Sequence, residues 1–198
     1  MQIIQVQRPD KESMHMESLQ GNFLISTSKM PDPRFREKLI YMCGHTEEGA
    51  IGLVVNDPLP DITLDEILKN VNIPVPDFEL PPVYLGGPVE MGSGFVLYIA
   101  DYHAENELQV SSTVCLSSDP QILQDITLHN GPSNYLFLLG YAGWGPGQLD
   151  NELMDNGWLT LPAEDDIIFK TPDSMKWKVA AQKFGIDITT YGDVVGSA

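Results

Sequence analysis

Short apolar runs bounded by turn residues dominate the chain, and this pattern predicts a protein made mostly of β-sheet. The runs are too short for helices and are rich in β-branched and aromatic residues. The predicted strands are Phe23–Ser28, Lys38–Cys43, Ala50–Asn56, Pro82–Gly86, Gly94–Ala100, Leu108–Leu116, Asn134–Gly140, Trp158–Pro162 and Asp166–Phe169.

Four segments instead show helical spacing or helix-capping residues. Thr63 and Glu66 form a capping box, and apolar residues then recur at helical spacing. Asp119 and Pro120 open a second helix, and the third, short helix runs from about Gly147 to Asp155. Thr171 and Pro172 open the fourth, with the side chains of Met175, Val179 and Ala180 predicted to face the core.

Strands and helices do not alternate strictly, which disfavours a doubly wound parallel sheet. The pattern favours an α+β fold with a large mixed or curled sheet and about four helices outside it. Its 198 residues suit one domain, 19–198. Met1–Ser18 is polar and without periodicity, so residues 1–18 are predicted to be a flexible N-terminal arm.

Charge is distributed very unevenly. The formal net charge is −17, and residues 70–169 contain no Lys or Arg but fourteen Asp and Glu. Phosphate backbones are bound chiefly by Lys and Arg, so this half of the chain is not expected to bind nucleic acid directly. Four lysines between Lys170 and Lys183 could give the last helix a positive face, although a simple solvated face explains them as well.

The sequence also suggests a cellular location. No stretch reaches the roughly 20 apolar residues of a membrane span, and the first residues lack the apolar block of a signal peptide. Cys43 and Cys115 have no CxxC spacing and lie in strand-like runs, so both are expected to be buried thiols. We therefore expect a cytoplasmic protein with no membrane partner.

The segment GYAGWGPGQLDNEL, Gly140–Leu153, is the most unusual in the chain. Its glycines allow positive φ angles or close backbone approach, so we expect a sharp turn after the strand that ends at Gly140. Trp144, between two glycines, either fills the core from above or forms an exposed stacking surface. Gln148, Glu152 and Asp155 share one helix face, which is either a solvated surface or a set of oxygen ligands for a divalent cation.

Other candidate sites are weaker. Gly86, Gly87 and Pro88 form a tight turn or an anion cradle, but no Lys or Arg lies near them in sequence. Asp101, His103, Glu105 and Glu107 alternate as in a metal site, yet the segment is polar enough for a solvated loop. His45 is placed in a turn between two strands. Ser93 lacks the features of a nucleophile elbow.

The chain resembles the YqgE/AlgH family of bacterial proteins. The matching pieces run in order over almost everything after residue 18: GNFLIS, DPRF, GAIGLVVN, YLGGPV, GFVLY, LGYAGWGPGQLDNEL, NGWLTLPA, IIFKTP, FGIDI and the terminal GSA. The resemblance implies a bifurcated sheet partly closed into a barrel. It implies no particular reaction, and the label of transcriptional regulator that some members bear concerns an effect on expression. The positions that match are Asn56, Gly86, Gly87, Pro88, Gly140, Trp144, Gly147, Gln148, Leu149, Glu152 and Trp158.

The chain departs from the family pattern at four places. Asp57 stands where the family often has a cation, Ser93 where it has an arginine, and Tyr98 where it has a histidine; the chain ends GSA where GHA is common. Any family chemistry that needs that arginine and histidine is in doubt here.

Two functional hypotheses follow, beside a third interpretation in which the acidic surface only confers solubility. The first is a non-enzymatic binding or regulatory module that acts through contacts with a partner protein, without cofactor or metal. The second is an enzyme or a small-ligand or metal binder with a pocket beside the glycine turns. The candidate binding surface in either case is Asn56, Gly86, Gly87, Trp144, Gln148 and Glu152, and no catalytic residue is assigned.

The charge distribution makes a direct prediction. A fluorescence titration with labelled duplex DNA at physiological salt should show no binding, since half of the chain lacks any Lys or Arg. A micromolar affinity that weakens with added salt would contradict it.

Overall fold

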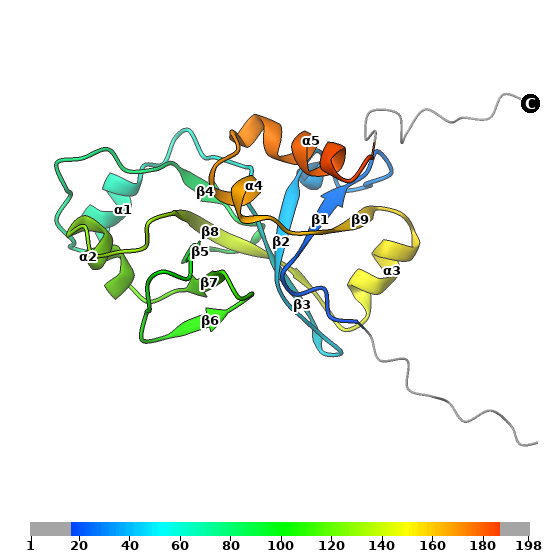
Figure 1. Cartoon of the computed structure of the whole chain (residues 1–198), viewed down its shortest axis with the longest axis horizontal. Helices are drawn as coiled ribbons and strands as arrows, with labels where there is room; N and C mark the ends of the chain where they lie inside the picture. Colours follow the sequence, from blue (N-terminus) through cyan, green and yellow to red (C-terminus); the bar gives the residue numbers. More distant parts are fainter. Residues whose placement is uncertain (1–16, 187–198) are drawn as a thin grey trace, which may run out of the picture.

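The computed structural model describes residues 17–186, which form nine strands and five α-helices around a mixed sheet (Figure 1). The strands are β1 (Asn22–Ser26), β2 (Leu39–Thr46), β3 (Gly49–Val54), β4 (Val83–Leu85), β5 (Val89–Ile99), β6 (Glu107–Gln109), β7 (Val114–Ser117), β8 (Tyr135–Trp144) and β9 (Trp158–Pro162). The helices are α1 (Leu64–Asn70), α2 (Gln121–Thr127), α3 (Gln148–Met154), α4 (Asp165–Phe169) and α5 (Asp173–Lys183). The predicted α+β class is confirmed. Most of the predicted N-terminal arm, residues 1–16, lies outside the described residues.

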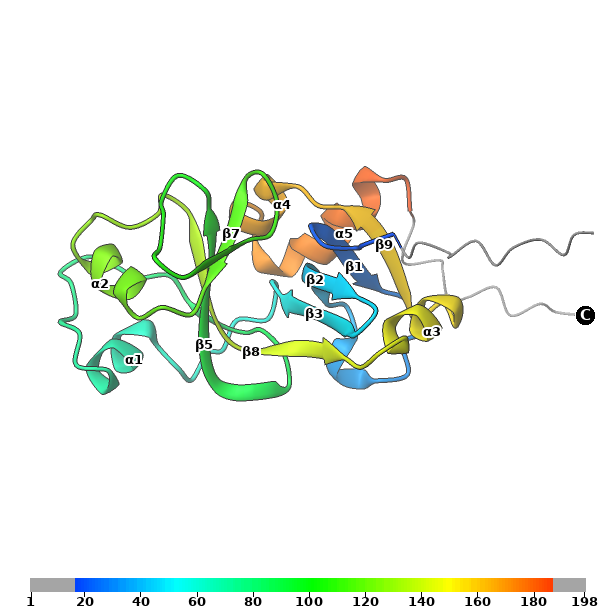
Figure 2. The same ribbon diagram turned by 90° about the horizontal axis from the view of Figure 1, so that it is seen from below.

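The sheet divides at β8. Its strand order is β6-β7-β5-β8-β3-β2-β1-β9, and β4 pairs in parallel with β8. Residues 135–141 of β8 pair with β5, whereas residues 142–144 pair with β3. β8 therefore runs from one half of the molecule into the other, and the sheet curls around it as a bifurcated, partly closed barrel (Figure 2).

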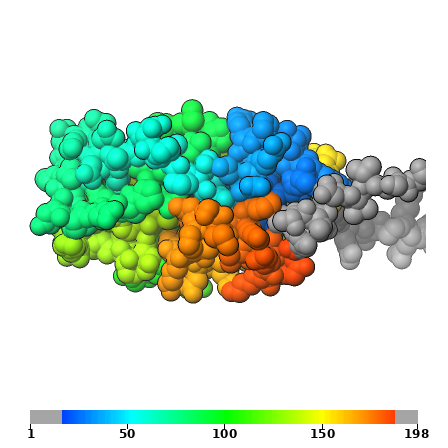
Figure 3. Space-filling view, turned by 90° about the horizontal axis from the view of Figure 1, so that it is seen from above, coloured from blue at the N-terminus to red at the C-terminus, as the bar shows by residue number. Residues whose placement is uncertain are grey.

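Helices cover the two halves separately. α1 and α2 lie over the half built on β5 and β8, and α3 lies at the opposite end (Figures 1 and 2). α4 and α5 lie across the middle, beside the segment that contains the first strands (Figure 3). Thr63 and Glu66 make both bonds of the predicted capping box at the start of α1. No helix of residues 17–186 is long and apolar enough to cross a bilayer.

Close backbone contact fixes the point where the sheet divides. A Cβ atom on Gly87 would collide with the backbone of Tyr141 and Ala142, and one on Gly86 with the carbonyl oxygen of Gly140. Gly140 has φ of 68°, in the left-handed region that favours glycine, and a Cβ there would lie 2.8 Å from the Val89 carbonyl oxygen. The Gly86–Gly87 turn is thus a packing feature against β8.

Two strand predictions were wrong in extent. β8 does not end at Gly140 but continues to Trp144, because the left-handed glycine creates an irregularity in pairing with β5 without ending the strand. The chain turns only at residues 145–147. The predicted strand Leu108–Leu116 is the hairpin of β6 and β7, closed by hydrogen bonds from Val110 and Ser111 to the Val114 carbonyl oxygen.

The predicted strand Asp166–Phe169 is helix α4, which accounts for the fifth helix. Ile167 and Ile168 are both buried. Neighbouring residues of a strand point to opposite faces, whereas neighbours on a helix can both reach the same core. Glu164 precedes the helix, and its carbonyl oxygen accepts hydrogen bonds from the Ile167 and Ile168 amides.

The inward face of α5 also differs from the prediction. Ala180 is buried as predicted, but Met175 is 43% exposed and Lys176 is buried in its place. The Lys176 ammonium donates to the Val55 carbonyl oxygen and pairs with Asp173, both at 2.8 Å. Burial lowers the pKa of Lys176, and the hydrogen bond to Asp173 opposes that shift. This lysine therefore does not contribute to a solvated positive face.

Both cysteines are buried and free, as predicted. Burial raises the pKa of the Cys43 thiol to about 12, and it also raises that of Cys115.

The glycine contact predicts a specific stability loss. Gly87→Ala should lower the free energy of unfolding by about 1–3 kcal/mol or more, because the new methyl group meets backbone that cannot rotate away. Gly92→Ala is the matched control, since a Cβ at Gly92 meets nothing within 4 Å, and it should change stability by less than about 0.5 kcal/mol. Urea denaturation measures both; equal values for the two variants would refute the packing explanation.

Candidate functional site

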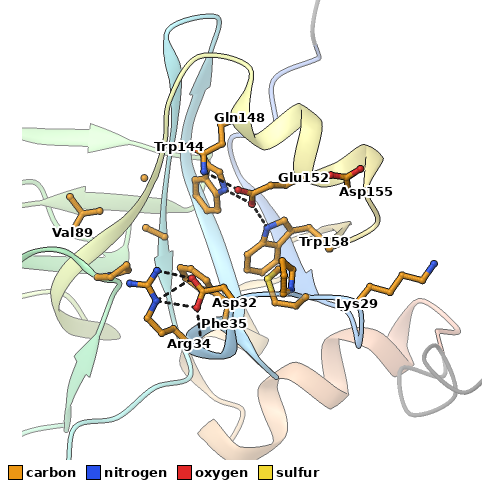
Figure 4. Close-up of a pocket in the computed structure, with 16 residues that line it drawn as sticks. Lys29, Asp32, Arg34, Phe35, Val89, Trp144, Gln148, Glu152, Asp155 and Trp158 are labelled. Carbon is orange, nitrogen blue, oxygen red and sulfur yellow. Dashed lines mark hydrogen bonds and ion pairs between the residues drawn. The ribbon is translucent and has the colours of Figure 1, made fainter.

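A pocket of about 470 Å³ lies between α3 and the loop that follows β1 (Figure 4). The β1–β2 loop and its 3₁₀ turn Pro33–Phe35 form one wall, and α3 forms the other. The C-terminal end of β8 and the N-terminal end of β9 lie between these walls. The lining residues are Lys29, Met30, Pro31, Asp32, Arg34, Phe35, Pro88, Val89, Ala142, Gly143, Trp144, Gln148, Glu152, Asp155, Gly157 and Trp158.

Three aromatic rings form the apolar part of the pocket. Trp144 at the end of β8 and Trp158 at the start of β9 meet edge to face, with ring centroids 6.2 Å apart. Phe35 packs against Trp158 in the same way at 5.5 Å. Trp144 is only 7% exposed, so of the two alternatives for this residue the structure shows core filling, while its indole also lines the pocket.

Glu152 joins these aromatic residues to α3. Its Oε2 accepts hydrogen bonds from the indole N–H groups of both Trp144 and Trp158 at 2.9 Å, and its Oε1 accepts one from the Gln148 amide at 2.9 Å. All three partners donate, so the carboxyl group acts only as an acceptor, which is the behaviour of the ionised form. Figure 4 shows the carboxylate between the two indoles.

The local sequence explains this arrangement. Gly147 adopts φ of 68° and lets the chain turn from β8 into α3, while Leu149 anchors the helix in the core. Gln148 and Glu152, one turn apart, then both face the strand ends, and the side-chain Oε1 of Gln148 accepts a bond from the Gly145 backbone amide. Glu152 therefore does not belong to a wet helix face, in contrast to Asp155, which is exposed.

An ion pair forms the opposite wall. Arg34 binds both carboxylate oxygens of Asp32, with the shortest contact at 2.6 Å. The hydrogen bond from Arg34 lowers the pKa of Asp32, and the same bond raises the pKa of Arg34. The Arg34 guanidinium also lies 6.0 Å from the centre of the Phe35 ring. Lys29, in the same loop, is exposed and also lines the pocket.

The structure brings together half of the predicted binding surface. Trp144, Gln148 and Glu152 all line the pocket. Gly86 and Gly87 do not line it, although the next residues, Pro88 and Val89, do.

Asn56 lies away from the pocket. Its side-chain amide accepts a bond from the Leu39 amide and donates one to the Glu37 carbonyl oxygen, both at 2.9 Å. Asn56 therefore stabilises the loop before β2, which is a structural role.

The sequence interpretation missed the other wall. Lys29, Asp32, Arg34 and Phe35 precede α3 by more than a hundred residues, so no local pattern connects them with Glu152. The signals that could have found them were the DPRF piece and Trp158, both of which match the family. The β1–β2 loop also brings the cations Lys29 and Arg34 into one pocket with Pro88 and Gly143, which belong to segments without any Lys or Arg.

The weaker candidates form no metal cluster. Within residues 17–186 no group of three His, Cys, Asp or Glu is placed to hold an ion. Glu107 accepts bonds from the Tyr98 hydroxyl and the Ala104 amide and pairs with exposed His103. Residues 101–106 are a loop as predicted, whereas Glu107, predicted to lie in the same loop, begins β6.

His45 is not in a turn, which corrects its predicted position. It lies within β2, buried, and its Nδ1 accepts a bond from the Leu19 amide at 3.3 Å. The turn between β2 and β3 consists of Glu47 and Glu48, because β2 extends further than its apolar run suggests.

Comparison with known proteins gives consistent matches over nearly the whole chain. The model of the AlgH-like family matches residues 23–189. A UPF0301 protein of Desulfotalea psychrophila is 43% identical over 91% of this chain and 95% of its own length. The UPF0301 protein YqgE of Salmonella paratyphi B is 38% identical over 91% of this chain and all of its own.

Solved structures agree with the sequence matches. The solution structure of the AlgH protein from Pseudomonas aeruginosa is 33% identical, covers 98% of this chain and all of its own, and has a TM-score of 0.74. A protein from Corynebacterium diphtheriae, at 19% identity and a TM-score of 0.68, shares the fold over 87% of this chain and 90% of its own. None of these names states a reaction or a ligand.

Glu152 should contribute strongly to stability. Glu152→Ala leaves two largely buried indole N–H groups without their acceptor, so it should lower the free energy of unfolding by about 2–5 kcal/mol. Asp155→Ala, at the exposed residue that follows α3, should change it by less than about 0.5 kcal/mol. Urea denaturation separates the two cases; a small effect at Glu152 would show that the indoles do not depend on its carboxylate.

Proposed function

This chain belongs to the AlgH-like family, and from that premise we propose that it is a non-enzymatic binding module that regulates a partner protein through direct contact. The pocket between α3 and the β1–β2 loop is the contact surface. Its walls come from distant parts of the sequence and meet at the end of the sheet. The acidic middle of the chain argues against direct binding to DNA as the basis of regulation.

The observation that carries this proposal is the role of Glu152. Three donors use three of the roughly four lone pairs of the Glu152 carboxylate, so this group primarily holds α3, Trp144 and Trp158 in place. Asp32 is likewise bound to Arg34. The lining contains no Ser, Thr, Cys, His or Tyr, the residues that most often supply a nucleophile or a proton relay. The side chains of Glu152 and Asp32 therefore serve to fix the shape of the pocket.

A second candidate function rests on the size of the pocket. About 470 Å³ lies within the usual range of roughly 300–1,000 Å³ for small-molecule sites, so the pocket is large enough to enclose a metabolite. A thermal-shift screen against metabolites and divalent cations tests this. A saturable rise in melting temperature that Asp155→Arg abolishes would favour a small ligand over a protein partner.

The proposal predicts a pattern of capture from cell lysate. Immobilised protein should retain a partner, identified by mass spectrometry and then shown to bind in purified form. Asp155→Arg, at the pocket, should abolish retention, because it places a bulky charge at the mouth. Glu105→Arg changes the charge equally in the exposed 101–106 loop and should retain the partner. Identical captured proteins for all three chains would refute the pocket as the contact surface.

A further inference from the structure

We infer that the pocket receives an arginine side chain presented by the partner protein. This inference rests on the proposed function and adds the chemistry of the recognised group. Four features of the pocket point to a cationic guest: an unpaired negative charge, aromatic faces, the charge balance of the lining and an open strand edge.

The first feature is the charge on Glu152. Its three hydrogen-bond partners are two indoles and an amide, all neutral, and no cation pairs with it among residues 17–186. Exposed Asp155, one turn further along α3, is also without an ion pair in that part of the chain. A partly desolvated carboxylate without a counter-charge attracts a cation more strongly than one in open water.

The second feature is the aromatic lining. The faces of tryptophan and phenylalanine rings carry negative potential and attract guanidinium groups within about 6 Å. The pocket already shows one such contact, since Arg34 lies 6.0 Å from the Phe35 ring centre. An arginine has an apolar stem that suits apolar lining residues and a planar head that stacks on aromatic rings such as that of Trp144.

The third feature is the charge balance. Asp32 and Arg34 neutralise each other within one wall of the pocket. The other charged lining residues are Glu152, Asp155 and the cation Lys29, so the net charge of the lining is negative. The chain as a whole carries −17, which steers basic partners toward it and repels acidic ones.

The fourth feature is an open edge of the sheet. Residues 142–144 of β8 pair with β3 on one side, and no other described strand pairs with them. Ala142, Gly143 and Trp144 line the pocket, and Gly143 is exposed. An extended segment of a partner can therefore lie along this edge and direct an arginine toward Glu152.

The test is an NMR titration of the full chain with N-acetyl-arginine methylamide. The three tryptophans give three indole N–H signals, and Trp177, which bonds to the Ser26 carbonyl oxygen outside the pocket, is an internal control. The probe should shift the signals of Trp144 and Trp158 saturably, with a Kd on the order of 1–10 mM for its size, and leave Trp177 unchanged. N-acetyl-glutamate methylamide and N-acetyl-leucine methylamide should shift neither.

Two variants that leave the Glu152 bonds intact sharpen the test. Asp155→Asn should weaken binding of the arginine probe by about two- to five-fold, and Lys29→Ala should strengthen it by a similar factor. Preference for the glutamate probe, lost in Lys29→Ala, would overturn the inference in favour of an anion site. Absence of any saturable shift would also overturn it.

These outcomes are separable from the proposed function. If the probe fails while Asp155→Arg still abolishes capture of the partner, the pocket remains the contact surface and only the cationic chemistry is wrong. If the probe binds but capture does not depend on the pocket, the protein-contact function fails instead.

Discussion

The hydrogen bonds of one carboxylate stabilise the end of the molecule at which α3 lies. Glu152 accepts a hydrogen bond from a tryptophan at the end of β8 and another from a tryptophan at the start of β9, so a short helix is fixed to two strands at a single point. Both indole N–H groups are nearly inaccessible to water and need an acceptor. Glu152 and both tryptophans line the pocket, so the same bonds also fix its inner wall.

The glycine contact at the division of the sheet supplies the second constraint. The Gly86–Gly87 turn lies against the backbone of residues 140–142, an approach that any side chain would prevent. This contact accompanies the change in pairing by which β8 leaves β5 and joins β3. Because β8 changes its pairing partner, Trp144 at its end lies close enough to Glu152 to form a hydrogen bond. Both constraints use residues that match the family, which gives those matches a physical meaning.

Much of the fold could be predicted from local pattern. The alternation of short apolar runs and turns identified almost every strand, and the capping box at Thr63 located α1. The failures have local causes. Ile167 and Ile168 look like a strand in the sequence because so short an apolar run shows neither a helical nor a strand period, and their common burial is visible only in the structure. Lys176 was predicted to be exposed because its buried partners, Asp173 and the Val55 carbonyl oxygen, cannot be paired with it from sequence alone.

Only half of the pocket was accessible to sequence reasoning, since Trp144, Gln148 and Glu152 share one segment whereas Arg34 and Lys29 come from a loop far away in the chain.

The pocket is proposed to attract a cation through Glu152 and its aromatic neighbours. Isotope-filtered NOE spectroscopy on the protein with the arginine probe tests it most directly. The claim predicts cross-peaks between the δ-methylene protons of the probe and ring protons of Trp144. Cross-peaks only to surface residues elsewhere, such as Leu128, would contradict it.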